Sequence, residues 1–151
     1  MKCELNPRLS SGDWKEFCSR FHFPLEELPN IQAIYKALLP LMESYAYYSL
    51  NQDLKEVSFS HYAYGFVTLG NGMDELSELY LNHEQIQEAY IVDCISLMLL
   101  SKAYEEFAYV VEEQSGLYLT ELSFLGDTYS LDLLPQIYEQ LAPDTIQFTE
   151  G

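Results

Sequence analysis

Apolar side chains between residues 31 and 48 recur at intervals of three or four residues, which is the period of a helix. Asn30 is a favourable N-cap, so the pattern predicts a helix from residue 30 to about residue 50. Pro40 lies inside this range and predicts either a kink or a division into two shorter helices. The preceding residues, 1–29, hold three prolines and a glycine, which predict an irregular N-terminal arm with one short helix over residues 13–21.

Two further helices follow from the same period in the second half of the chain. A short amphipathic helix is predicted over residues 73–82, and a much longer one from residue 84 to about residue 114. Residues 89–100, in the middle of the long helix, are apolar all round and carry Asp93 as their only charge. We therefore expect this helix to lie at the centre of the fold, covered on most sides, with a buried Asp93 carboxylate.

Strands are predicted where aromatic and β-branched residues alternate with small polar ones. The clearest covers residues 57–69 and is closed by the turn Gly70-Asn71-Gly72. Residues 117–124 and 145–149 predict two more strands, with a helix over residues 130–141 between them. The order α-β-α-α-β-α-β favours an α+β fold in which helices pack on a small sheet.

Charge narrows the classes of function. Seven Lys and Arg stand against 24 Asp and Glu in 151 residues, a formal net charge of −17, so a nucleic-acid backbone or an anionic membrane would be repelled. An aromatic content of 15% nevertheless predicts a folded chain rather than an acidic disordered tail. We expect no nucleic-acid partner and no membrane partner.

The distribution of cysteine and histidine bears on location and on metals. No secretory signal or membrane-length apolar segment is recognised, and the three cysteines have unrelated spacings, which predicts a cytoplasmic protein. The three histidines are scattered as well, so no metal site is expected.

Asp93 is the main candidate for chemistry, because Ser96 lies three residues later on the same side of the predicted helix. A buried carboxylate beside a hydroxyl indicates either a ligand pocket or an anchor for neighbouring backbone, and the anchor is favoured. The turn Gly70-Asn71-Gly72 lies between a strand and a helix, where phosphates bind, but it lacks the full glycine fingerprint, so a tight turn is the better interpretation.

Other polar and aromatic groups have simpler explanations. The acidic residues of the helices are expected to form solvated faces, and no nucleophile with an acid–base partner is recognised, so catalysis has no positive support. A set of tyrosines either packs in the core or lines a groove for a planar ligand or a partner; it comprises Tyr35, Tyr45, Tyr47, Tyr48, Tyr62 and Tyr64.

Four groups of residues in the second half of the chain have a familiar order and spacing. They are Val67-Thr68-Leu69-Gly70 with Met73-Asp74-Glu75-Leu76, Ile91-Val92-Asp93-Cys94-Ile95-Ser96, Leu122-Ser123 with Gly126-Asp127, and Phe148-Thr149-Glu150. On these residues the chain resembles the activation domain of cobalamin-dependent methionine synthase, and especially the small stand-alone relatives of that domain.

The resemblance implies a twisted antiparallel sheet packed with helices, S-adenosylmethionine as the ligand, and a corrinoid protein or methyltransferase as the partner. It divides the single expected domain into a helical arm of residues 1–56 and an activation-domain-like part of residues 57–151. The ligand-binding residues that it implies, together with the candidates above, are Asp93, Ser96, Glu121, Ser123, Gly126 and Asp127.

The family's ligand loop reads Arg-x-x-Pro-Gly-Tyr, whereas this chain has Glu121 where the family has arginine, and it lacks the Pro-Gly-Tyr turn. This reversal of charge argues against S-adenosylmethionine binding in the family's manner. The leading hypothesis is a stand-alone relative of the activation domain that serves corrinoid-dependent methyl transfer or its reactivation, and it predicts a concave site bounded by Asp93, Ser123 and Gly126. The alternative is a non-catalytic acidic module that binds a basic protein surface, and it predicts an exposed aromatic patch in place of a cleft.

Overall fold

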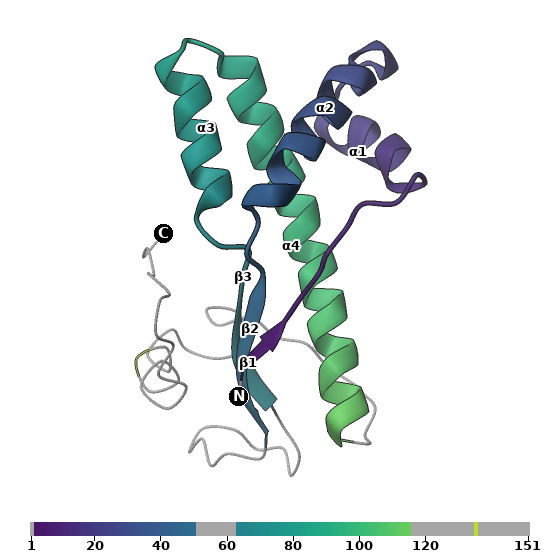
Figure 1. Cartoon of the computed structure of the whole chain (residues 1–151). Coiled ribbons are helices and arrows are strands. Elements are labelled where there is room, and N and C mark those ends of the chain that lie inside the picture. Colours follow the sequence, from purple (N-terminus) through teal and green to yellow (C-terminus); the bar gives the residue numbers. More distant parts are fainter. Residues whose placement is uncertain (1, 51–62, 116–134, 136–151) are drawn as a thin grey trace.

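The computed structural model describes residues 2–50, 63–115 and 135. In this part of the chain, four helices surround or face a small antiparallel sheet (Figure 1). The elements are β1 (Lys2–Glu4), α1 (Asp13–Phe21), the 3-10 turn η1 (Leu25–Glu27), α2 (Leu28–Leu38), the 3-10 turn η2 (Leu39–Leu41), β2 (Tyr45–Leu50), β3 (Ala63–Thr68), α3 (Gly72–Asn82) and α4 (Ile86–Ser115). The predicted α+β class, with a small antiparallel sheet and one long helix, is confirmed.

The sheet has the strand order β1-β2-β3, and both pairings are antiparallel. Lys2 lies opposite Tyr47 in the first pairing, and Tyr45 lies opposite Thr68 in the second. The prediction of an irregular arm over residues 1–29 is therefore wrong at residues 2–4, which form an edge strand. Three residues are too few for a periodic signal, and the partner strand is more than forty residues away.

The helix predicted over residues 30–50 is wrong in its second half. α2 ends at Leu38, Pro40 lies in the following 3-10 turn, and the chain is extended again at Met42. Tyr45 to Leu50 then form the middle strand of the sheet. Proline removes a backbone donor and obstructs the preceding helical turn, so at Pro40 it ends the helix rather than kinking it.

α4 is the element against which the rest of the described chain packs. In Figure 1, α1, α2 and α3 lie around its N-terminal half and the sheet lies beside its C-terminal half. Tyr48 of β2 joins the sheet to α4, because its ring meets Phe107 edge-on at 5.4 Å between centroids and its hydroxyl donates to Gln114 Oε1 at 2.6 Å. The fully buried members of this core include Phe17, Ile31, Leu38, Tyr48, Ile91, Val92, Ile95 and Leu99.

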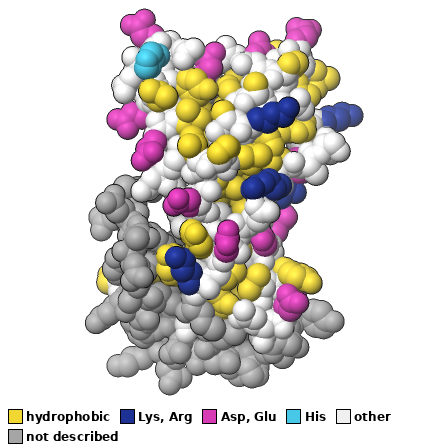
Figure 2. Space-filling view, in the orientation of Figure 1, with side chains coloured by type: hydrophobic (Ala, Val, Ile, Leu, Met, Phe, Trp, Pro, Cys, Tyr) yellow, Lys and Arg dark blue, Asp and Glu magenta, His cyan; other side chains and the backbone are white. Residues whose placement is uncertain are grey.

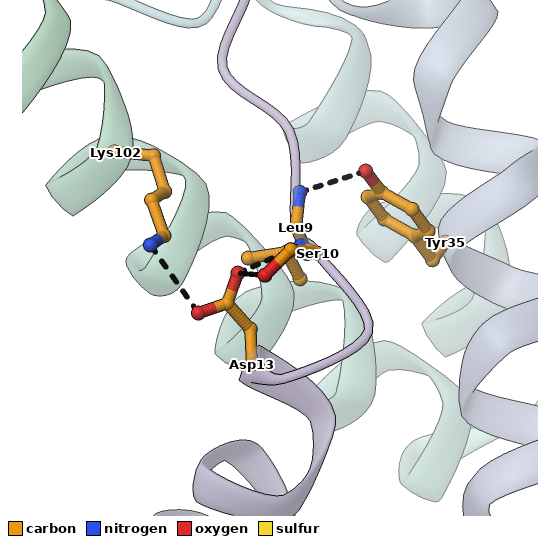
Figure 3. Close-up of polar contacts among 5 residues, drawn as sticks. All are labelled: Leu9, Ser10, Asp13, Tyr35 and Lys102. Atoms are coloured by element: carbon orange, nitrogen blue, oxygen red, sulfur yellow. Dashed lines mark hydrogen bonds and ion pairs between the residues drawn. The ribbon is translucent and has the colours of Figure 1, made fainter.

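The segment between β1 and α2 is held to the other elements by aromatic and polar contacts. The Trp14 ring of α1 meets the Tyr35 ring of α2 edge-on at 5.1 Å between centroids, and the buried Phe17 ring packs beside Trp14. Figure 3 shows the polar contacts: Asp13 Oδ2 accepts from the Ser10 backbone at 2.7 Å, and Asp13 Oδ1 lies 3.2 Å from Lys102 Nζ on α4. These contacts join the first twenty residues to the long helix.

Several sequence predictions lie outside the described residues, namely the strands over 117–124 and 145–149, the helix over 130–141 except residue 135, and residues 57–62 of the strand 57–69. The helices predicted over 13–21, 73–82 and 84–114 are confirmed within two residues at each end. In the ranges that the structure describes, no helix combines the length and the hydropathy needed to cross a membrane. The three cysteines, Cys3, Cys18 and Cys94, are free thiols.

Candidate functional site

A hollow of about 440 Å³ lies where the end of β3, the first turn of α3 and the middle of α4 meet. Thr68 and Gly70 come from the strand end, Asp74 from α3, and Asp93 and Ser96 from α4. The remaining lining residues are apolar: Val67, Leu69, Met73, Leu97 and Leu100. Its volume is in the range of small-molecule sites, but the hollow is shallow and wide open to solvent.

Gly70 shapes one wall of this hollow. Its φ of +84° is in the left-handed region, which glycine adopts at little cost, and an added Cβ would lie 3.1 Å from the Glu43 carbonyl oxygen. The Gly70 backbone N–H donates to Thr68 Oγ1 at 3.0 Å, which holds the turn closed. The interpretation of Gly70-Asn71-Gly72 as a tight turn between strand and helix is thus confirmed.

Asp93 lies at the hollow, but its predicted burial is wrong, because the side chain is exposed. Tyr90 and Leu97, one turn before it and one turn after it, are 49% and 53% exposed. The middle of α4 therefore has one side open to solvent. The sequence did not indicate it, because the residues on that side are mostly apolar. Among the described residues the Asp93 carboxylate makes no hydrogen bond or ion pair, so the structure shows no backbone segment that it anchors.

Ser96 is half-buried at the back of the hollow. Its hydroxyl lies 2.7 Å from the Val92 carbonyl oxygen and 3.0 Å from Met73 Sδ, so it reaches from α4 to the first turn of α3. Asp93 and Ser96 thus meet in one site as predicted, with Ser96 joining the two helices and Asp93 open to solvent.

Thr68 and Asp74 also line the hollow, although they are not among the candidate ligand-binding residues predicted from the sequence. Thr68 is the last residue of β3, and Asp74 lies in the first turn of α3. Strand ends and first helical turns that adjoin a glycine turn are common ligand positions, and this was the signal that could have identified them. The predicted residues Glu121, Ser123, Gly126 and Asp127 lie outside the described part of the chain.

The residues that line the hollow are suited to binding a ligand, and among the described residues they form no catalytic arrangement. Asp74 and Asp93 supply negative charge, Thr68 and Ser96 supply hydroxyls, and Leu97 belongs to the apolar wall. This combination suits a ligand that is cationic in one part and apolar in another.

The nearest thiol does not change this conclusion. Burial, followed by the nearby Asp93 charge, raises the pKa of Cys94 against the opposing effect of a hydrogen bond with Tyr90, so the thiol stays protonated at neutral pH. Across the described ranges no three His, Cys, Asp or Glu side chains are placed to hold a metal ion.

A second hollow, of about 420 Å³, lies on the other side of Thr68 and Gly70. Tyr45 and Tyr47 line it together with Glu43 and Glu75, and the Lys2 ammonium lies 4.3 Å from the centroid of the Tyr45 ring. Both alternatives for the tyrosines occur. Tyr45 and Tyr47 line a hollow, whereas Tyr35 and Tyr48 belong to the core. Tyr62 and the side chain of Tyr64 are outside the described part.

The solvated-face prediction for the acidic residues of the helices is confirmed at Glu75, Glu78, Glu105 and Glu113, which are exposed. Glu106 differs, because its carboxylate accepts the Asn6 backbone N–H at 3.0 and 3.1 Å and so holds the segment after β1. Comparison with known proteins adds no identity: no family model matches the chain, and no curated protein matches it.

Proposed function

We propose that this chain is a ligand-binding protein similar to the activation domain of cobalamin-dependent methionine synthase, and that it serves corrinoid-dependent methyl transfer or its reactivation. Its ligand site is the hollow between β3, α3 and α4. In this proposal the chain binds and presents a ligand, and the chemistry belongs to a corrinoid protein or methyltransferase partner.

One observation carries the proposal. Three of the sequence segments that support the resemblance, residues 67–70, 73–76 and 91–96, each contribute side chains to the same hollow. The first two segments adjoin one turn, but residues 91–96 come from the other helix of a hairpin, so their place in the same hollow does not follow from sequence proximity. A shared ligand explains why the resemblance is concentrated in them.

The chemistry of the hollow favours a cationic ligand. S-adenosylmethionine carries a sulfonium and an ammonium, and the exposed carboxylates of Asp74 and Asp93 lie where either cation would approach. The net charge of −17 also raises the local concentration of any cation. Because Glu121 replaces the arginine expected to hold the ligand's carboxylate, we expect the cationic groups to supply most of the affinity.

Isothermal titration of the full chain with S-adenosylmethionine tests the proposal, with thermal unfolding as a second readout because a ligand bound only by the native state raises its stability. We expect saturable binding that Asp93→Asn weakens by about tenfold, the loss typical of one charge-assisted contact. Glu105→Gln, which removes an exposed carboxylate from the same helix outside the hollow, is the matched control.

Two outcomes would overturn the proposal. One is the absence of binding at millimolar S-adenosylmethionine. The other is equal weakening by Asp93→Asn and Glu105→Gln, which would reveal general attraction to an acidic protein in place of a site. S-adenosylhomocysteine lacks the sulfonium but keeps the ammonium, and adenosine lacks both, so the two compounds separate recognition of each cation from recognition of the purine.

A further inference from the structure

The tip formed by η1 and the α3–α4 hairpin exposes large apolar side chains. We call this surface the tip face and define it by Leu25, Leu81, Ile86 and Tyr90, which are 64%, 52%, 71% and 49% exposed. Single exposed apolar residues are common on proteins, but several together indicate a contact surface.

Backbone and side-chain contacts connect the elements of the tip face. The Glu84 backbone N–H donates to the Leu81 carbonyl at 3.1 Å, so the turn that carries Leu81 runs directly into the start of α4, next to Ile86. On the other side, the Phe23 ring lies 5.7 Å from the Tyr90 ring.

The Gln87 amide of α4 also lies 3.5 Å from the Glu27 carboxylate, so both ends of the segment that holds Leu25 are next to the first turns of α4. These contacts place η1, the hairpin turn and the first turns of α4 next to one another.

Two helical rows extend from the tip face toward the hollow. Leu81 follows Asp74 and Glu78 along one side of α3, at spacings of four and three residues. Ile86 and Tyr90 continue into Asp93 and Leu97 along one side of α4. Asp74 and Asp93 both line the hollow, so the two rows run side by side, with apolar residues at the tip and carboxylates along their length.

The charge around this surface is mostly negative. Residues 63–101 contain six acidic residues and no lysine or arginine, and residues 22–35 add Glu26 and Glu27 without a cation. In the upper half of Figure 2, the Lys and Arg side chains lie on the side of α1 and α2, whereas the part over α3 shows acidic and hydrophobic side chains. Arg20 of α1 is an exception, because it lies close enough to Cys94 to lower the pKa of that thiol.

We propose that the tip face docks a basic amphipathic helix of a partner protein, with apolar side chains on Leu81, Ile86 and Tyr90 and lysine or arginine side chains along the acidic rows. Two antiparallel helices with an apolar seam accept a third helix in this way. Charge complementarity selects the occupant, because an acidic partner, an anionic membrane or a second copy of this chain would be repelled. Asp74 and Asp93 belong to both surfaces, but the apolar contacts at Leu81, Ile86 and Tyr90 do not depend on a ligand in the hollow.

A defined peptide tests the inference on the full chain. The probe is a labelled helical peptide of leucine and lysine with one apolar face, and binding is followed by fluorescence anisotropy. Because any lysine-rich peptide is attracted to a protein of charge −17, the comparison peptide has the same composition in a scrambled order without an apolar face. We expect the amphipathic peptide to bind at least about tenfold more tightly than the scrambled one.

Variants locate the contact without changing charge. Leu81→Ser with Ile86→Ser is expected to weaken binding of the amphipathic peptide by about tenfold or more. Tyr109→Ser is the matched control: it removes a 64%-exposed apolar side chain from the same helix, roughly 35 Å from Ile86 at 1.5 Å per residue. Asp93→Asn with S-adenosylmethionine reports on the hollow, so failure of one site is distinguishable from failure of the other.

The inference is overturned if the two peptides bind equally, if the double variant binds like the wild type, or if Tyr109→Ser weakens binding as much as the double variant does. It is also overturned if sedimentation shows a dimer of this chain that the double variant dissociates, because the occupant would then be a second copy. Circular dichroism of each variant confirms that the fold is retained.

Discussion

The side of α4 that faces α1 and the side that faces α3 are covered by different means. Toward α1, the buried Phe17 ring belongs to a group of aromatic contacts, and Lys102 pairs with Asp13. Toward α3, the two helices pack closely, as at Ser96 and Met73, but beside this contact Asp93 is exposed and a hollow remains. We expect the first side to contribute stability alone and the second side to contribute binding surface as well, and the following predictions test this division.

The largest expected effect is at the centre of the closed side. Phe17→Ala removes a ring with no exposed surface that contacts Trp14, Phe21 and Phe23. We expect a loss of about 3–5 kcal/mol in the free energy of unfolding, since the transfer and cavity costs add. Urea unfolding measures it, with the exposed Tyr109→Ala as the control. A loss below about 1 kcal/mol would contradict the assignment of stability to this side.

The polar contact on the same side is expected to matter less and to depend on pH. The Ser10 backbone N–H, and then the Ser10 hydroxyl and Lys102, lower the pKa of Asp13 against the opposing effect of burial. A lowered carboxyl pKa contributes stability above its unfolded value of about 3.9, and this contribution is lost as the pH falls through the folded pKa. Asp13→Ala should therefore cost about 2 kcal/mol at neutral pH and progressively less at acidic pH.

Urea unfolding of the wild type and Asp13→Ala between neutral and strongly acidic pH measures this difference. Glu78→Gln, an exposed change on α3, is the control and should leave the difference from wild type nearly constant. A cost for Asp13→Ala that stays the same across the whole range would show that the carboxylate contributes nothing through its charge.

A smaller effect is expected where the open side begins. Gly70→Ala places a Cβ on a residue with a φ of +84° and 3.1 Å from the Glu43 carbonyl oxygen. We expect a loss of about 1–2 kcal/mol, the usual cost of left-handed backbone for other residues. Gly12→Ala is the matched control, because its φ is −73° and its added Cβ is 4.0 Å from the closest atom. Equal effects of the two variants would remove the conformational argument for Gly70.

The smallest effect on stability is expected at the tip face. Ile86→Ser changes a side chain that is 71% exposed, so its free energy of unfolding should stay within about 0.5 kcal/mol of wild type. The same substitution should still weaken binding of the basic amphipathic peptide. This variant therefore separates an effect on binding from an effect on stability. A loss well above about 0.5 kcal/mol would mean that Ile86 supports the fold, and would contradict its assignment to a docking surface.

The sequence predicted helices better than it predicted the sheet. Helices over 13–21 and 73–82 were found because local period and local breakers define them. β2 was taken for a helix because Ala46, Tyr47 and Tyr48 are all buried, so both faces of the strand are covered and the alternation of polar and apolar residues is missing. β1 depends on a partner strand far along the chain, which no local pattern contains.

The candidate site was predicted in part for a similar reason. Asp93 and Ser96 were identified because a charge and a hydroxyl interrupt an apolar helix. The exposure of Asp93 was missed because its neighbours on the open side, Tyr90 and Leu97, are themselves apolar and indicate a buried face by composition. Thr68 and Asp74 join the site only through the pairing of β3 and the packing of α3 against α4, which are tertiary facts.

The joining of the first residues to α4 has a consequence for synthesis of the chain. Asn6 bonds to Glu106, one hundred residues later, and Asp13 pairs with Lys102. At about 5–20 residues per second, the ribosome needs roughly 4–17 seconds to extend the chain from the end of α1 to Glu106. During this interval Asn6 and Asp13 lack their partners on α4, and Trp14 can pack only against α2, through Tyr35. The incompletely packed start of the nascent chain is therefore a natural target for chaperones that act on growing chains.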